Sequence, residues 1–216
     1  MHPQFLIDLT NEIFNQMLNY PFDPNVSIKT LTTVSNNGYQ TTYIESPLHV
    51  STHIDFPIHF YENSFSSSDY DISYFYGKAL IINVKIFENQ QITLTNINDY
   101  FINIFTNYEY LIFNTGWSKF WGTEEYYYHY PYLSNELALF LSELKNLKGI
   151  GIDTPSVDKY DSSTFDAHKI LLKSRKIIIE NLCNIDSINS NECFIGFFPL
   201  KIKNSDGTPA RVVAFI

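Results

Sequence analysis

The sequence predicts an α/β or α+β fold that is rich in strands and has few helices. Short runs of β-branched and aromatic residues, which are typical of strands, recur along the chain. Segments with helix signals separate some of them. No linker-like stretch divides the 216 residues, so we expect one domain spanning 1–216. The strand-like runs occupy 39–45, 53–60, 78–87, 109–114, 148–153, 176–180, 194–200 and 211–216.

Three segments carry helix signals. The clearest is 134–146, where Ser134 can cap the amino-terminal end. Its apolar residues fall on one face at i, i+3, i+4 and i+7, namely Leu137, Phe140, Leu141 and Leu144. The second segment, 96–105, follows a threonine. The third, about 162–174, begins in the cap-rich stretch DSSTFD and ends before the strand-like KIIIE.

Charge and composition argue against several classes of protein. The formal net charge is −9, with 14 Lys and Arg residues against 23 Asp and Glu, whereas nucleic-acid-binding proteins concentrate basic residues. No run of about 18 apolar residues occurs, and an acid interrupts the opening MHPQFLIDLTNEIF, which argues against a membrane span or signal peptide. Cys183 and Cys193 form no CxxC motif, so we expect reduced, structural thiols. A cytoplasmic enzyme or binding protein is expected, with neither nucleic acid nor membrane as partner.

The stretch HVSTHIDFPIHF at 49–60 is a candidate metal site. On a strand, residues two apart point the same way, so His53, Asp55 and His59 would share one face, and His49 would join them by a bend. Imidazole nitrogens and a carboxylate suit Zn²⁺, or the harder Mn²⁺ or Fe²⁺. The alternative is a solvated polar face on an edge strand. The opposite, core-facing side would comprise Ile54, Phe56, Ile58 and Phe60.

Glu180 is a second candidate ligand. It ends the apolar run KIIIE, where a buried carboxylate is costly unless a cation lies beside it. The nearest basic residues, Arg175 and Lys176, stand at the start of the run, so a salt bridge elsewhere or an exposed strand end is the alternative. His168 lies twelve residues earlier on the predicted helix. Ligands sufficient for two carboxylate-bridged metal ions are therefore present: His49, His53, Asp55, His168 and Glu180.

These motifs resemble those of a known family, the metal-dependent cyclase or kynurenine formamidase-like hydrolases. The family signature is H-x-G-T-H-x-D-x-P-x-H, and HVSTHIDFPIH matches every fixed position except one, where Ser51 replaces glycine. FLIDLTNEI, YPFDP, LIFNTGW, GIDTPSVD and RVVAFI resemble further family segments in the correct order. His168 in DAHKILL and Glu180 in IIIENL stand twelve residues apart, as the second pair of ligands does in that family.

The resemblance implies a fold, cofactors and ligand roles. His49, His53 and Asp55 would bind metal, with Asp55 bridging two ions. His168 and Glu180 would complete the coordination of the second ion. The family's fold is an α/β arrangement of the swivelling β/β/α kind, built around a mixed sheet. The implied cofactor is Zn²⁺, two ions per chain, with Mn²⁺ as the alternative, and the implied assembly is a homodimer or larger homo-oligomer.

The resemblance also implies a reaction. His59 would be the general acid/base rather than a ligand, and would pass a proton to the leaving nitrogen after metal-activated water attacks the amide. The substrate would be a small aryl amide resembling N-formylkynurenine, which belongs to tryptophan catabolism. Two alternatives stay open. One is a related hydrolase or cyclase acting on another cyclic amide or lactone, such as isatin, and the other is a metal-binding homologue without catalytic activity.

Candidates for substrate binding are Tyr20, Ser51 and Phe60. Tyr20 precedes Pro-x-Asp, where formamidases tend to have tryptophan. Ser51 and Phe22 each replace a family glycine, which would allow a positive φ. Either the backbone at position 51 has shifted, therefore, or the serine hydroxyl has acquired a role beside the metals. Further aromatic candidates for the pocket wall, each also explained by core packing, are Trp117, Trp121, Tyr126, Tyr127 and Tyr128.

Overall fold

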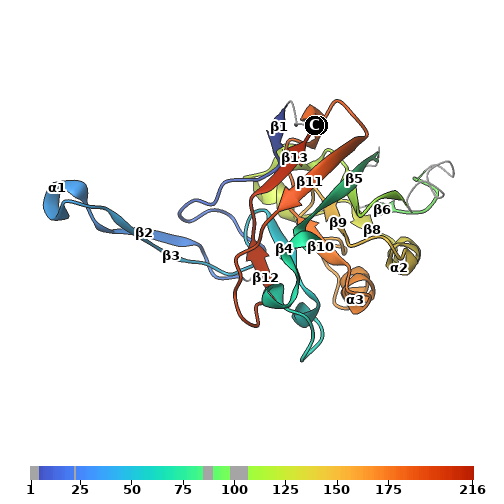
Figure 1. The fold of residues 1–216 in the computed structure, drawn as a ribbon, viewed down its shortest axis with the longest axis horizontal. Helices are drawn as coiled ribbons and strands as arrows, with labels where there is room; N and C mark the ends of the chain where they lie inside the picture. Colours follow the sequence, from blue (N-terminus) through green and yellow to red (C-terminus); the bar gives the residue numbers. More distant parts are fainter. Residues whose placement is uncertain (1–4, 22, 85–89, 98–106) are drawn as a thin grey trace.

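The computed structural model describes residues 5–21, 23–84, 90–97 and 107–216, which are organised around a nine-stranded sheet (Figure 1). The strands of this sheet are β1 (Leu6–Asp8), β4 (His53–Asp55), β5 (Tyr76–Asn83), β7 (Tyr110–Asn114), β9 (Gly149–Ile152), β10 (Ile177–Glu180), β11 (Glu192–Phe197), β12 (Gly207–Pro209) and β13 (Val212–Phe215).

The sheet is mixed. Its order is β1-β13-β11-β5-β7-β9-β10-β4-β12. The central strands β5, β7, β9 and β10 pair in parallel, and every pair outside them is antiparallel. The strands β7, β9 and β10 are buried along their whole length, as expected for parallel strands covered on both faces. The predicted α/β class with a mixed sheet is therefore confirmed.

Two helices, α2 (Asn135–Glu143) and α3 (Asp166–Lys173), cover one face of the sheet. Ser134 caps α2 as predicted, because its hydroxyl accepts the N–H of Leu137 at 3.1 Å. Helix α3 precedes β10 in the chain and packs against it. Apolar side chains from the helices and strands form one cluster, which includes Leu111, Phe113, Leu137, Leu141, Ile150, Leu171, Leu172 and Ile178.

The other face of the sheet curls around a second apolar cluster. Ile54 from β4 and Val212 from β13 both belong to this cluster, although these strands lie near opposite edges of the sheet. Ile54 and Phe56 are fully buried. Ile58 and Phe60, which we had placed on the same core-facing side, are only partly buried. The predicted anchoring of this stretch therefore holds only for its first half.

The strand predicted at 53–60 ends after three residues and is followed by a 3₁₀ helix, Pro57–His59. Pro57 has no N–H to donate to a strand ladder. The N–H of His59 donates to the carbonyl of Phe56 at 2.9 Å, which closes a helical turn. The prediction that strand alternation places His59 beside the other ligands is therefore wrong. His59 approaches the site from this turn instead.

The other predicted strands correspond to observed ones with shifted ends, and residues 85–87 lie outside the described ranges. The predicted helix 96–105 falls largely outside them too. The third predicted helix begins at Asp166 rather than at 162. The sequence did not indicate β1, β12 or three further strands, which are β2 (Ser27–Thr32), β6 (Gln91–Ile92) and β8 (Tyr132–Leu133).

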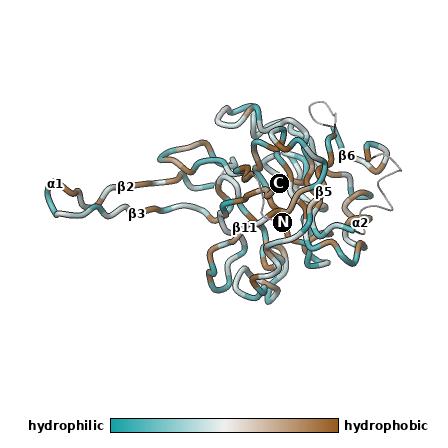
Figure 2. Tube along the Cα trace, turned by 45° about the horizontal axis from the view of Figure 1, so that its top comes forward, coloured by the Kyte–Doolittle hydropathy of each residue, from teal (hydrophilic) through white to brown (hydrophobic). Residues whose placement is uncertain are grey.

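A long hairpin projects from the body of the molecule (Figure 1). It consists of β2 paired with β3 (Thr41–Glu45), with the short helix α1 (Val34–Asn37) at its tip. We call residues 27–45 the arm. Figure 2 shows hydrophobic as well as hydrophilic positions along the arm. None of the helices in the described ranges is long and apolar enough to cross a membrane.

Candidate metal centre and pocket

The pairing of β4 with β10 positions three of the predicted ligands, and helix α3 positions a fourth. In this antiparallel register Glu180 lies directly opposite His53, and Asp55 lies two residues further along β4 on the same face. His168 projects from α3, which precedes β10. All four side chains are buried. His49 comes from the loop before β4 and is partly exposed.

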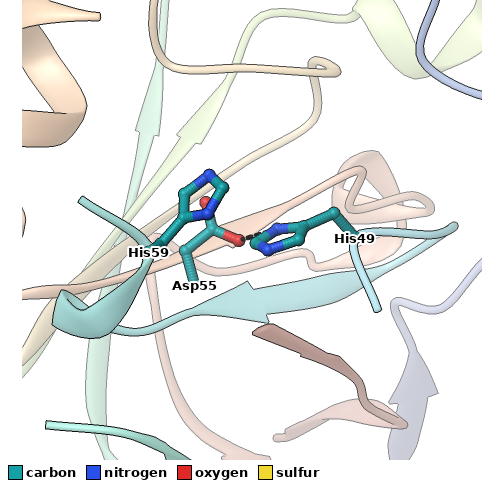
Figure 3. A group of neighbouring side chains, drawn as sticks. All are labelled: His49, Asp55 and His59. Carbon is teal, nitrogen blue, oxygen red and sulfur yellow. Dashed lines mark ion pairs between the residues drawn. The ribbon is translucent and has the colours of Figure 1, made fainter. Parts of the chain in front are cut away.

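The donor atoms of these residues converge on Asp55. Its Oδ1 lies 2.7 Å from His49 Nδ1, an ion pair drawn in Figure 3, and 3.2 Å from His53 Nε2. Its Oδ2 lies 3.1 Å from His168 Nε2. Glu180 approaches the last two imidazoles, with Oε2 3.5 Å from His53 Nε2 and Oε1 3.3 Å from His168 Nε2. The structure therefore brings the five predicted ligands together around one carboxylate.

The geometry and chemistry of this donor set fit divalent cations. Ligand atoms at about 2.0–2.2 Å from a tetrahedral metal ion lie about 3.3–3.6 Å from one another, and the separations of 2.7–3.5 Å here are of that size or slightly shorter. Asp55 Oδ1 is buried and accepts no well-formed hydrogen bond from the described residues. Two groups of mutually close donors share Asp55: His49 and His59 in one, His53 and Glu180 in the other.

The pKa values of the site show that its carboxylates stabilise positive charge beside them. Burial alone would raise the pKa of Asp55, but the imidazoles of His49 and His53 hold it well below its ordinary value. Burial lowers the pKa of His49, yet the carboxylates of Asp55 and Asp206 raise it to about 10. Burial also lowers the pKa of His168, and its carboxylate neighbours raise it well above the usual value. Without bound metal, protons on His49 and His168 offset part of the negative charge.

His59 lies at the edge of this centre. Its ring centroid is 4.1 Å from that of His49, and its side chain is 30% exposed. Its Nδ1 lies 3.5 Å from Asp206 Oδ2. The position suits proton transfer to a bound molecule. His59 is also close enough to His49 and Asp55 to act as a ligand.

A cavity of about 360 Å³ opens over the ligands. All three residues predicted to bind substrate, Tyr20, Ser51 and Phe60, line it, as does Tyr127. Phe60 packs beside the imidazole of His168, with ring centroids 5.3 Å apart. The remaining aromatic candidates do not belong to the described lining of this cavity, and they are Trp117, Trp121, Tyr126 and Tyr128.

Ser51 keeps the backbone conformation that a glycine would adopt. Its φ is +54°, so the serine Cβ costs about 1 kcal/mol here. Its hydroxyl donates to the carbonyl of Asn11 at 2.9 Å, away from the ligand atoms. Its own carbonyl accepts the Nδ1–H of His53 at 2.9 Å. The left-handed backbone at position 51 is one that glycine adopts readily, and the hydroxyl is committed to Asn11 rather than to the ligand atoms. Phe22, the other departure, lies outside the described residues.

Comparison with known proteins identifies the family. A family model described as putative cyclase matches residues 7–159. The chain belongs to this family. A kynurenine formamidase of Bacillus mycoides (strain KBAB4) is 30% identical over 208 residues, which cover 96% of this chain and 95% of that one. The family recognised from the sequence motifs is therefore confirmed.

Two solved structures have the fold of this cyclase-family chain. Isatin hydrolase A from Ralstonia solanacearum has a TM-score of 0.84 at 21% identity, covering 97% of this chain and 91% of that one. A "predicted metal-dependent hydrolase" from Bacillus stearothermophilus has a TM-score of 0.78 at 24% identity, covering 97% of each chain. At these identities the likeness concerns the fold.

In this member of the cyclase family, hydrogen bonds on the side away from the donor cluster orient two of the imidazoles. The two carboxylates that accept them, Asp158 and Asp206, were not among the residues predicted from the sequence. His168 Nδ1 donates to Asp158 Oδ2 at 2.6 Å, and Asp158 also accepts two N–H groups at the start of α3. His49 Nε2 donates to Asp206 Oδ2 at 3.1 Å. Such partners fix the tautomer and ring orientation of a ligating histidine. Asp158 is the last residue of the family-like segment GIDTPSVD, which could have marked it as a site residue. No motif in the sequence marks Asp206.

A glycine in β12 leaves room for His49. Gly207 pairs with Asp55, and a Cβ at Gly207 would lie 2.6 Å from the His49 ring. We expect Gly207→Ala to displace this imidazole and to weaken metal binding by about 10-fold or more, the scale seen when the support of a ligand is lost. Titration with Zn²⁺ under competition by a chelator measures this. Gly38→Ala in the arm is the control: its φ of +78° strains an alanine, but no atom lies within 4 Å of the added Cβ and it is remote from the site, so it should bind metal as the wild type does.

Proposed function

We propose that this chain is a metal-dependent amidohydrolase that cleaves the C–N bond of a small aryl amide, in the manner of an arylformamidase. The observation that carries the proposal is the convergence of four metal-type ligands on the buried Asp55, a fifth, in a cavity that aromatic side chains also line. The kynurenine formamidase relative, aligned over nearly the whole chain, supports the substrate class. The proposed substrate resembles N-formylkynurenine.

The proposed cofactor is a pair of Zn²⁺ ions, with Mn²⁺ as the alternative. His49, His53 and Asp55 would hold one ion, and His168 and Glu180 would hold the other together with Asp55. Three imidazoles and two carboxylates are a donor set that both metals accept. When bound, such an ion lowers the pKa of a water molecule and polarises a carbonyl group.

Proton transfer, orientation of the imidazoles and contact with the aryl ring would each fall to residues of the chain. His59, which is partly exposed beside the ligands, would move the proton to the leaving nitrogen, as a positioned imidazole does in general acid–base catalysis. Asp206 would steady His59 and His49 together, since one of its oxygens faces both rings. Phe60 and Tyr20 would contact the aryl ring of the substrate from the wall of the cavity.

A cyclic aryl amide is the second candidate substrate. The observation that favours it is the isatin hydrolase with the same fold, TM-score 0.84. Opening such a ring needs the same attack on an amide carbonyl and the same proton transfer to nitrogen. The two candidates therefore differ in the shape of the bound molecule rather than in the residues used.

Metal removal and substrate comparison test the proposal. We expect chelator-treated protein to be inactive, and reloading with Zn²⁺ or Mn²⁺ to restore hydrolysis of N-formylkynurenine more strongly than that of isatin. Elemental analysis should give about two equivalents of metal per chain. Less than one equivalent after careful loading would contradict the metal centre. Metal binding without turnover of a broad panel of amides and esters would instead indicate a binding protein.

His59→Ala should separate catalysis from metal binding. Loss of a general acid/base typically costs about 10²–10⁴-fold in rate, so we expect kcat to fall on this scale while the metal content stays at the wild-type level. His129→Ala removes an exposed imidazole that packs against Tyr160 outside the cavity, and serves as the control. If metal content falls together with activity in the His59 variant, His59 is a ligand rather than the proton carrier.

We also propose that the protein is a homodimer or larger homo-oligomer, with the arm as a contact surface. A two-stranded hairpin is at best marginally stable in water when it packs against nothing. The arm nevertheless exposes large apolar side chains, which are Leu31, Val34, Tyr39, Tyr43 and Ile44. A second copy of the chain would cover them.

Light scattering coupled to size-exclusion chromatography tests the assembly. We expect the wild type to elute with at least twice the mass of one chain, and the double variant Tyr43→Ser/Ile44→Ser to shift towards the monomer because it removes apolar surface from the arm. Ile72→Ser is the control, since Ile72 is more exposed than either arm residue but lies outside the arm. A monomeric wild-type protein at micromolar concentration would contradict the proposal.

A further inference from the structure

A carboxylate without a partner stands at the wall of the cavity. Asp23 lines the cavity together with Tyr20, and its N–H donates to the Tyr20 carbonyl at 3.1 Å, so one short turn presents both side chains. Asp23 has exposed surface, as expected at the mouth of a pocket. Within the described ranges its side chain accepts no hydrogen bond and lies in no ion pair. The mechanism proposed above gives it no task.

The charges around the cavity make Asp23 distinctive. The other acids in the described lining are Asp55 and Glu180, both already placed among the metal ligands. The described lining includes neither lysine nor arginine. The pocket therefore offers no side-chain cation, apart from its histidines, to pair with an anionic group of the substrate. Asp23 is the one acid of the described lining outside the proposed ligand set, and the only charged neighbours that act on it are the imidazoles of His49, His53 and His59.

We propose that Asp23 is a specificity-determining residue that binds an ammonium group on the substrate. The preferred class would be an aryl formamide whose side chain carries an amine that is protonated at neutral pH. The aryl ring would lie against Tyr20 and Phe60, with the formamide over the ligands and the ammonium group at Asp23. This inference rests on the proposed function for its reaction, but the charge preference itself concerns binding.

Three matched substrates test the preference. They share an N-formyl aniline ring with an ortho acyl chain that ends in an ammonium, a hydroxyl or a carboxylate group. We expect metal-loaded wild type to prefer the ammonium substrate over the hydroxyl one by about fivefold in kcat/KM, mainly through KM, because partly exposed ion pairs contribute on this scale. In Asp23→Asn the ratio should fall to about one, and Asp23→Lys should favour the carboxylate substrate.

An acid outside the cavity provides the control for Asp23. Glu136→Gln removes an exposed acid at the start of α2, outside the described lining of the cavity, and should keep the wild-type ratio. An unchanged ratio in Asp23→Asn would overturn the inference. So would a uniform loss of activity on all three substrates with the ratio preserved, which would indicate a structural role.

A binding measurement separates this inference from the proposed function. Calorimetric titration of metal-loaded protein with the three corresponding aryl amines, the deformylated products, requires no turnover. If no formamide is hydrolysed, the amidohydrolase proposal fails, and tighter binding of the ammonium product, lost in Asp23→Asn, still supports the role of Asp23. If formamides are hydrolysed but neither rates nor binding depend on the terminal charge, only the role of Asp23 fails.

Discussion

The burial of Asp55 is the constraint on which the rest of the site depends. An ionised carboxylate that is 1% exposed costs several kcal/mol unless cations surround it. The fold supplies these from different directions, through the loop before β4, β4 itself and α3. Strand β4 pairs with both β10 and β12, and Ile54 and Phe56 fix it in the core. Burial of Ile54 on one face of β4 thus fixes the positions of His53 and Asp55 on the other.

Strand register and outer hydrogen bonds turn this cluster into an oriented set of donors. A one-residue slip of β4 against β10 would turn His53 and Asp55 away from Glu180. Each imidazole then has one nitrogen committed outwards, to Asp206, to Asp158 or to the carbonyl of Ser51. The inward nitrogens are consequently left for ligation. The positive φ of Ser51 belongs to this arrangement, because it aims the carbonyl that orients His53.

How much the sequence could predict depends on the range of each signal. Local periodicity found α2 with its Ser134 cap and the apolar strands at the centre of the sheet. The alternation from Ile54 to Phe60 suggested one strand, but Pro57 ended it, and only the longer motif placed His59 correctly near the ligands. Asp206 is 157 residues from His49, and no local pattern could place the two together. Of the arm, the strand-like run at 39–45 indicated β3, but nothing indicated β2 or the projecting hairpin, since these strands bury no apolar face.

Charge balance connects the number of metal ions with the kind of molecule that the pocket favours. Four carboxylates surround the ligand atoms, two as ligands and two as outer partners: Asp55, Glu180, Asp158 and Asp206. Two divalent cations, as proposed, would carry four positive charges and match them, whereas a single ion would leave protons on His49 and His168 to balance the remainder. Once the ions are matched, Asp23 remains as an additional negative charge at the wall of the cavity, which favours a cation over an anion at that end of a bound molecule.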